Sequence, residues 1–463
     1  MSQKHRAPQP RKDSSVASPS HRRSLRKRRV VIVSAAAVTA AGLGAVAFVM
    51  NANAGTVDLA HQVLPAKDGW AASGSGTTGG SQADSSHVYT VSNRAQLVKA
   101  LGKADNSTPK IIQVKGVIDA NTDDSGRKLS CADYSAGTGY AAAAYLKAYD
   151  PATYGTSKLP SGTQEKARDA AQQKQAKNIV FKVPANTTIV GVPGTKAGIT
   201  GGSLQVQSVD NVIIRNLTFS ATEDCFPQWD PTDGDSGNWN SQYDAVTLRG
   251  ATHVWADHNT FTDASHFDSA NPKHYGREYQ IHDGDLDITK GSDLVTVERN
   301  QFTNHDKTML IGSSDTDSVG KLRVSIHHNV WKGIVQRAPL TRIGQVHIYN
   351  NYFDTTTVNG YAPLYSINSR AKAQVVAEDN YWKVPTGGKI SKLLSGDGTG
   401  SIAGGGNLVN GTSTDLVAAY NAANSKKLKT TVNWTPTLNA GIQSSAKNLP
   451  TELATTTGAV LAN

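Results

Sequence analysis

The chain has 463 residues and a formal net charge of +10. Almost all of this charge lies in residues 1–54, which hold ten Lys or Arg and one acid, Asp13, whereas the remaining residues carry 37 basic and 36 acidic side chains. The net charge of the whole chain is therefore no sign of nucleic-acid or membrane binding by its main part, for which we expect neither, and an acidic polymer must be bound by a local patch.

Residues 1–54 have the pattern of an export signal. An apolar run from Val30 to Met50 follows the basic start, and Ala52-Asn53-Ala54 then gives a small-x-small cleavage pattern. We predict a signal peptide at 1–54 and a secreted, extracellular domain at 55–463 that is free of the membrane after cleavage. The run is long enough to span a bilayer, so an uncleaved anchor is the alternative.

The first part of the domain mixes helices and strands. Ser92-Asn93 precedes residues 94–101, which favour a short capped helix covering the open N-terminal end of the fold. Residues 110–117 and 188–192 favour strands, and 164–177 favour a helix.

One phrase, V-x-[IVA]-x-x-N-x-[FW], recurs six times between Val212 and Trp382. The copies begin at Val212, Val254, Val295, Val324, Val346 and Val375, and end at Phe219, Phe261, Phe302, Trp331, Phe353 and Trp382. The Asn positions are Asn259, Asn300, Asn329, Asn351 and Asn380, with Leu217 in the first copy. Alternating apolar residues predict a strand, and we expect the chain to turn on the Asn in a left-handed conformation.

Such a unit cannot bury its own apolar face, so the copies must stack. Stacking in parallel predicts an all-β, right-handed parallel β-helix with inward aliphatic, aromatic and Asn columns. The copies are 42, 41, 29, 22 and 29 residues apart, and 22 residues suffice for one turn. Residues 220–243 and 263–282 are therefore long loops, which we expect to form a cleft on one face. Residues 415–427 favour a late helix.

Both long loops end in acids. The first contains Asp233 and Asn240 and ends at Asp244, and the second ends in His282-Asp283-Gly284-Asp285-Leu286-Asp287. In a straight strand Asp283 and Asp287 would lie roughly 13 Å apart, but Gly284 lets the chain turn and bring them together. Oxygen donors without Cys or paired His favour Ca²⁺ over zinc. A solvated acidic loop is the alternative.

Basic residues follow on the next predicted rungs. Lys307, Arg337 and Arg342 should lie in line with the acids and could, together with Ca²⁺, hold an anionic polymer. The alternatives are a salt bridge from Lys307 to Asp306 and an arginine–acid ladder across the rungs.

Two further pairs stand out. Cys131 and Cys225 are an even pair, which suggests a disulfide in an exported protein, although two buried thiols would also fit. His327 and His328 invite a metal interpretation, but their rings should diverge, which favours structural or hydrogen-bonding roles.

Several motifs together resemble the pectate lyases of polysaccharide lyase family 1, over residues from about Gly69 to the C-terminus. The matching stretches are Asp-Gly-x-x-Asp-Ile at 283–288, His305-Asp306-Lys307, Gln336-Arg337-Ala338-Pro339-x-x-Arg342, 226–233 and 239–244.

The resemblance implies Ca²⁺-dependent β-elimination on homogalacturonan (polygalacturonate, pectin) by a secreted bacterial enzyme, which we expect to be a monomer. By this resemblance Asp244, Asp283 and Asp287 bind the primary calcium, and Asp233 and Asn240 match positions that bind further calcium with substrate. Lys307 and Arg342 match residues that grip substrate carboxylates. Arg337 matches the base, although the residue type alone favours a clamp, because guanidinium is normally always protonated.

Other functions compete with this hypothesis. A pectin lyase acts on methylated pectin without calcium, and the three Asp argue against it. A β-helical glycoside hydrolase would use an Asp pair such as Asp285 and Asp287. A non-catalytic, pectin-binding β-helix is the alternative from a different class.

Overall fold

The computed structural model describes residues 58–317 and 320–462. The predicted leader, 1–54, lies outside the described residues, so its cleavage stays a prediction. Within the described part, none of the helices combines the length and the apolar character that crossing a membrane requires.

Three long sheets run through the domain, and we call them sheets I, II and III. Sheet I contains β1 (Val88–Val91), β2 (Lys110–Val114), β5 (Thr187–Gly191), β8 (Asp210–Arg215), β13 (Thr252–Asp257), β18 (Asp293–Glu298), β21 (Arg323–His327), β24 (Gln345–Tyr349), β27 (Gln374–Glu378) and β30 (Ser401–Ala403). Sheet II contains β4 (Val180–Lys182), β7 (Ser203–Gln207), β12 (Val246–Arg249), β17 (Leu286–Thr289), β20 (Leu310–Ile311), β23 (Leu340–Arg342), β26 (Ile367–Arg370) and β29 (Leu394–Gly396). Sheet III contains β3 (Val117–Asp119), β6 (Gly198–Thr200), β9 (Thr218–Ser220), β14 (Thr260–Thr262), β19 (Gln301–Lys307), β22 (Val330–Gln336), β25 (Tyr352–Asp354), β28 (Tyr381–Lys383), β31 (Leu408–Val409) and β32 (Thr412–Ser413).

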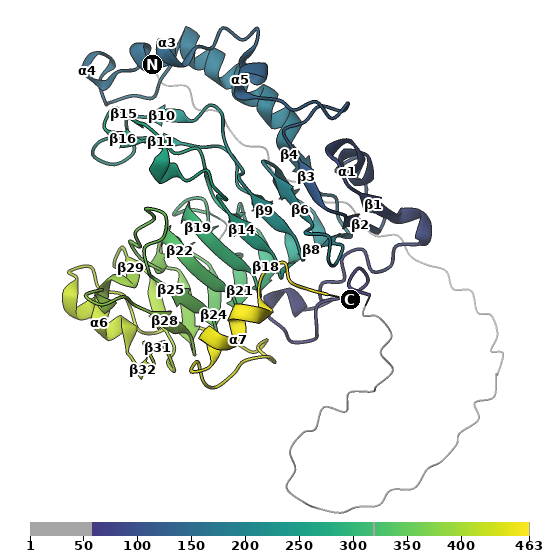
Figure 1. The fold of residues 1–463 in the computed structure, drawn as a ribbon. Helices are drawn as coiled ribbons and strands as arrows, with labels where there is room; N and C mark the ends of the chain where they lie inside the picture. Colours follow the sequence, from purple (N-terminus) through teal and green to yellow (C-terminus); the bar gives the residue numbers. More distant parts are fainter. Residues whose placement is uncertain (1–57, 318–319, 463) are drawn as a thin grey trace, which may run out of the picture. The chain divides into compact units, whose positions relative to one another are not determined.

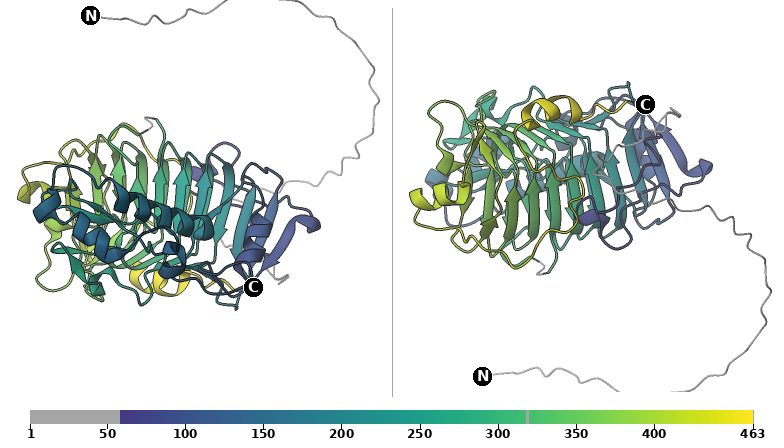
Figure 2. Two further views of the ribbon diagram at one scale, coloured as in Figure 1. Left: turned by 90° about the horizontal axis from the view of Figure 1, so that it is seen from above. Right: turned by 90° about the horizontal axis from the view of Figure 1, so that it is seen from below.

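From β7 onward the chain visits sheets II, I and III in turn, and each circuit is one rung of a right-handed parallel β-helix (Figures 1 and 2). The register confirms the predicted repeat. Val212 pairs with Val254, Val254 with Val295, and the column continues through Val324 and Val346. Equivalent residues align because the strands pair in parallel without a shift, which buries the same face on every rung.

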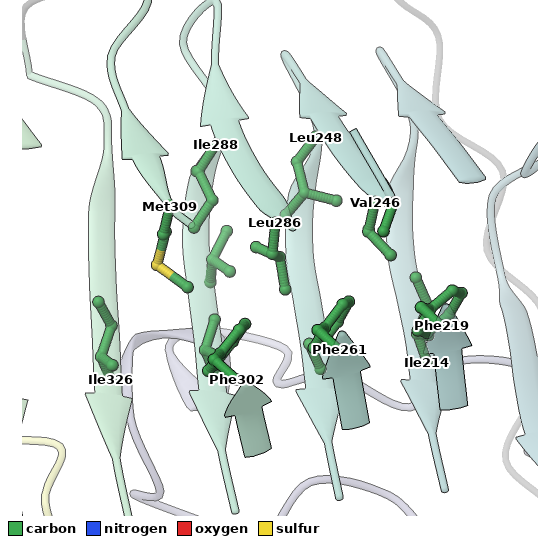
Figure 3. Close-up of a cluster of buried hydrophobic side chains, with 14 of the residues drawn as sticks. Ile214, Phe219, Val246, Leu248, Phe261, Leu286, Ile288, Phe302, Met309 and Ile326 are labelled. Atoms are coloured by element: carbon green, nitrogen blue, oxygen red, sulfur yellow. The ribbon is translucent and has the colours of Figure 1, made fainter. Parts of the chain in front are cut away.

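The interior is filled by the inward residues of all three sheets. Figure 3 shows Leu286 and Ile288 of β17 pointing inward above Phe302 of β19. The predicted aromatic column is confirmed: rings on neighbouring rungs stack at centroid distances of 5.1, 4.9, 4.2, 5.9 and 4.6 Å from Phe219 through to Trp382. The stacked aromatic rings and the branched aliphatic side chains together give the dense packing expected of a protein core.

The Asn ladder forms where sheet I passes into sheet III, but its conformation corrects the prediction. The backbone N–H of Asn300 donates to Oδ1 of Asn329 (2.8 Å), and that of Asn329 donates to Oδ1 of Asn351 (3.0 Å). The left-handed residue is the one before each ladder Asn, such as Arg299 (φ 49°) and His328 (φ 55°). The buried Asn amide is needed to bond the neighbouring rungs, so the turn falls on the preceding residue.

A seventh, degenerate copy extends the column. Ile402 and Val409 take the places of the Val and the aromatic residue, and Asn407 accepts from the backbone N–H of Asn380 (3.1 Å). The sequence pattern missed this copy because it has Ile402 in place of the first Val, Gly404 at the third position and Val409 in place of the aromatic residue.

The helices are α1 (Arg94–Leu101), α2 (Cys131–Ser135), α3 (Ala142–Ala148), α4 (Pro151–Tyr154), α5 (Thr163–Ile179), α6 (Leu416–Ala423) and α7 (Leu449–Thr456), with 3-10 turns η1 (Trp70–Ala72), η2 (Ser85–His87), η3 (Asp268–Ala270) and η4 (Ile390–Lys392). The predicted helices α1, α5 and α6 are confirmed. Asn93 caps α1, whose Leu97 and Leu101 join the main core, while its role as a cover stays a prediction.

The two long loops leave the corner between sheets III and II. Each forms a hairpin, β10 (Gln228–Asp230) with β11 (Asn238–Asn240) and β15 (Lys273–His274) with β16 (Arg277–Glu278). In Figure 1 these hairpins lie beside α3 and α5, and Trp229, Trp239 and Tyr145 pack between them. A disulfide joins Cys131 and Cys225, as predicted, and so ties α2 to the first loop.

Candidate active site

A groove of about 740 Å³ follows the outward face of sheet II. One column of outward side chains runs along its floor, because Lys182 pairs with Gln205, Gln205 with Thr247 and Thr247 with Asp287. Asp244 and Asp283 also line it. The groove therefore extends across several rungs to the three aspartates.

The structure brings Asp244, Asp283 and Asp287 together at the corner between sheets III and II. Asp244 Oδ1 accepts from the Gly284 backbone N–H (2.9 Å), and Asp287 Oδ1 accepts from that of Leu310 (2.8 Å). A Cβ at Gly284 would lie 2.5 Å from Asp287 Oδ1 and 2.9 Å from Asp244 Oδ1. Glycine is therefore required so that the two carboxylates can approach this backbone.

Electrostatics show that these carboxylates share one environment. Burial, then repulsion by Asp283, raises the pKa of Asp244 to about 7. Burial, then repulsion by Asp244 and Asp283, raises the pKa of Asp287 well above its ordinary value. Clustered carboxylates of this kind mark a site that a cation would stabilise.

A buried network behind the cluster holds Asp283 in place. His305 Nε2 lies 2.6 Å from the Asp283 carbonyl oxygen, and its Nδ1 lies 2.6 Å from Asp263 Oδ1. Burial lowers the pKa of His305, but Asp263 and Asp285 outweigh burial and raise it well above its ordinary value. The sequence motif contained His305, but only the fold could pair it with Asp263.

Lys307, Arg337 and Arg342 lie on the rungs after the aspartates, as predicted. Lys307 pairs in register with Gln336, and Leu310 of β20 pairs with Leu340 of β23. The proposed salt bridge from Lys307 to Asp306 does not form. Neighbouring strand residues point to opposite sides, and Asp306 instead accepts from Gln280 (2.5 Å) and Gln336 (3.0 Å).

The two arginines differ in their contacts. Arg342 donates to Asp315 (3.0 Å) and to the Gly312 carbonyl (3.1 Å), and the same Asp315 lies 3.8 Å from Arg370 on the next rung. The arginine–acid ladder therefore runs through Arg342 and Arg370, and not through Arg337 and Arg342 as that alternative supposed. Arg337 is half-buried in a left-handed conformation (φ 61°), and its Nε has no hydrogen-bond partner among the described residues. Of these two arginines, only Arg342 is paired with an acid among the described residues.

Asp233 and Asn240 lie further out. Asp233 is exposed at the turn of the first hairpin, where Oδ2 accepts from Asn238 (3.0 Å), and Asn240 pairs with Gln228. Their participation in a metal site stays a prediction.

The fold and this corner define a class of protein: a parallel β-helix whose surface groove ends in an acidic cluster beside basic side chains. The chain matches the family model described as pectate lyase over residues 43–136 and 152–456. It is 50% identical over 400 residues to a pectate lyase of Bacillus subtilis (strain 168), covering 85% of this chain and 92% of that relative. A solved structure of a pectate lyase bound to hexasaccharide is 47% identical, with a TM-score of 0.83, covering 88% of this chain and 100% of the other. A thermostable pectate lyase, PL 47, is 42% identical with a TM-score of 0.84 over the same shares. The chain belongs to the pectate lyase family and is a polysaccharide lyase.

Proposed function

We propose that the chain is a secreted, calcium-dependent pectate lyase that cleaves homogalacturonan by β-elimination. The observation that carries this proposal is the corner itself: three aspartates line the end of a long groove, and the three basic residues follow on the next rungs. The similar pectate lyase bound to a hexasaccharide supports an extended acidic sugar as the substrate.

Asp244, Asp283 and Asp287 would hold the calcium ion. They offer only hard oxygen donors, and the bare backbone at Gly284 leaves two of the carboxylates close together, which suits Ca²⁺. When bound, the ion would neutralise these carboxylates and stabilise negative charge on the carboxylate of the substrate.

The basic residues would perform the remaining chemistry. Lys307 and Arg342 bind carboxylates of the sugar chain, and Arg342 is already oriented by Asp315 and Gly312. Arg337 would accept the C5 proton, the role that the family resemblance implies for this position, and its Nε has no hydrogen-bond partner among the described residues. The electron pair of the C5–H bond forms the C4–C5 double bond, the C4–O bond breaks, and the departing oxygen takes a proton.

The decisive experiment incubates the protein with polygalacturonate and follows the ultraviolet absorbance of the unsaturated product, with Ca²⁺ and then with a chelator. Arg337→Lys and Asp283→Asn should each lower the rate at least roughly a hundredfold, the lower end of the range found when an electrostatic or acid–base group is removed. Arg127→Lys, an arginine on the surface near α2, is the matched control and should keep the wild-type rate.

Each other outcome identifies a competitor. A rate that survives the chelator would mean pectin lyase-like chemistry, whereas new reducing ends without absorbance would mean hydrolysis. Binding without either signal would mean a non-catalytic, pectin-binding β-helix.

A further inference from the structure

A second group of ligating side chains lies on sheet I, away from the groove of sheet II. It is covered by the N-terminal segment 58–77, which we call the N-terminal strap; in Figure 1 its purple ribbon lies beside β18. The Ala71 backbone N–H donates to Thr296 Oγ1 (3.1 Å) on β18, and that of Trp70 donates to Ser325 Oγ (3.0 Å) on β21. The strap therefore buries polar residues that would otherwise face water.

Asp68 of the strap meets Glu298 of β18 and His327 of β21 beneath this cover. One ligating atom from each lies within 4.8 Å of the other two, and of the residues that the structure describes these three form the group that meets this spacing. Asp244, Asp283 and Asp287 of the groove do not meet this spacing as a group of three. His327 is 1% exposed, and its Nε2 makes no hydrogen bond although it lies 3.5 Å from Asp68 Oδ1, which is also unpaired.

The other atoms of these side chains are held by neighbours. Glu298 Oε1 accepts from the indole N–H of Trp255 (2.6 Å), and the His327 ring stacks on Tyr349 with centroids 4.6 Å apart. His327 Nδ1 lies 3.0 Å from Nδ1 of His328. A metal-binding imidazole commonly has one nitrogen fixed by a hydrogen bond and the other free for the ion, as in this arrangement.

This contact corrects the expectation that the two His rings diverge. The rings meet edge-on at 83°, because His328 adopts a left-handed conformation (φ 55°) that ends the alternation of the strand. The sequence favoured structural or hydrogen-bonding roles for both His residues, and the contact between their Nδ1 atoms fits a hydrogen-bonding role. It leaves Nε2 of His327 without a hydrogen-bond partner.

Protein groups alone leave the cluster unsatisfied. Arg215 is paired with Asp257 (2.7 Å) and so does not neutralise Glu298. The positive charge of Arg299 acts on the carboxyl groups of Asp68 and Glu298. It does not provide a hydrogen-bond partner for Nε2 of His327. Buried polar atoms are rarely left unpaired, so each such atom needs an explanation.

We propose that Asp68, Glu298 and His327 bind a divalent transition-metal ion of the zinc class, separately from the calcium site. One imidazole and two carboxylates match the ligands that zinc accepts, whereas a calcium site uses oxygen donors only. Because the ligands come from the strap and from two neighbouring rungs, the ion fastens the strap to the β-helix.

The test measures bound zinc on the tag-free full chain. Bound metal is first removed with a chelator, and the protein is then dialysed against zinc chloride. After removal of unbound zinc, the zinc content is measured by inductively coupled plasma mass spectrometry, and calorimetry gives the affinity. The wild type should retain about one zinc ion per chain, as tetrahedral protein sites do. His327→Gln and Asp68→Asn should weaken binding at least roughly tenfold, because each removes a ligand.

Two controls make the outcome specific. His347→Gln changes a buried His of the same sheet whose Nε2 is already paired with Glu378 (2.7 Å), and Asp283→Asn changes the groove; both variants should keep the zinc. Asp68→Asn lies on the partly exposed strap, so it tests the site even where His327→Gln does not fold. Failure of the wild type to retain zinc, or equal zinc in all four variants, would overturn the proposal. Neither result bears on the lyase reaction, because the assay contains no substrate.

Discussion

Gly284 provides the sharpest test of the acidic cluster. In Gly284→Ala the new Cβ would meet Asp287 Oδ1 at 2.5 Å and Asp244 Oδ1 at 2.9 Å, whereas ordinary contact begins at 3.4 Å. The two carboxylate oxygens must therefore move by about 0.9 Å and 0.5 Å relative to the backbone. Both are fixed by hydrogen bonds, from Gly284 itself and from Leu310, so the shift disturbs the cluster rather than a flexible chain end.

A misplacement of about 1 Å can cost roughly a hundredfold in rate, so we expect a loss of that order at limiting Ca²⁺. The assay is the initial rate of product absorbance on polygalacturonate as calcium is varied, and the calcium concentration for half-maximal rate should rise. Gly405→Ala is the matched control, because a Cβ there meets nothing within 4 Å. A Gly284→Ala rate within about threefold of wild type at limiting calcium would refute the role of this cradle.

Three further predictions follow from the fold. With chelator present, thermal stability should fall as the pH rises from about 4 to 7. The pKa of Asp244 is raised to about 7 in the folded protein, so the folded state binds this proton more tightly than the unfolded state does. A rise in stability over that pH range would contradict this prediction. Replacing Cys131 and Cys225 by Ser should lower the free energy of unfolding by up to about 4 kcal/mol, since the bond closes a long loop spanning 94 residues; unchanged denaturant midpoints would contradict it. Asn329→Ala removes the acceptor of the buried Asn300 N–H and should cost about 3 kcal/mol in guanidinium unfolding, and a loss below about 1 kcal/mol would show that the ladder is replaceable.

The repeat could be predicted from the sequence because stacking makes it redundant. Each Val at the start of a copy faces the same interior, so six copies report one environment, and the columns follow from the strand period. The prediction that Asn329 is left-handed was wrong. Intrinsic propensity favours Asn in a left-handed turn, but the buried Asn329 is needed for hydrogen bonds between neighbouring rungs, and His328 is left-handed instead. Here a tertiary hydrogen bond overrides a local preference.

The site was predictable to the extent that it follows the rungs. Asp283, Lys307 and Arg337 lie in successive turns, and a known turn length places them together. The contacts of His305 with Asp263 and of His327 with Asp68 join residues 42 and 259 positions apart. No local pattern encodes such pairs, because they depend on where loops and the strap pack against the finished sheets.

The N-terminal strap also has a consequence for the order of folding. Its Gly69 backbone N–H donates to Leu438 (2.8 Å), and near the other end of the chain the Leu461 N–H donates to Asn216 (3.0 Å). Rungs can form as soon as neighbours 22 to 42 residues apart are available, but both of these contacts require nearly the whole chain. Contacts of such sequence separation form late, since the entropy of closing a large loop must be overcome first. A C-terminal truncation that removes Leu438 but keeps every rung would therefore leave the N-terminal strap without this contact.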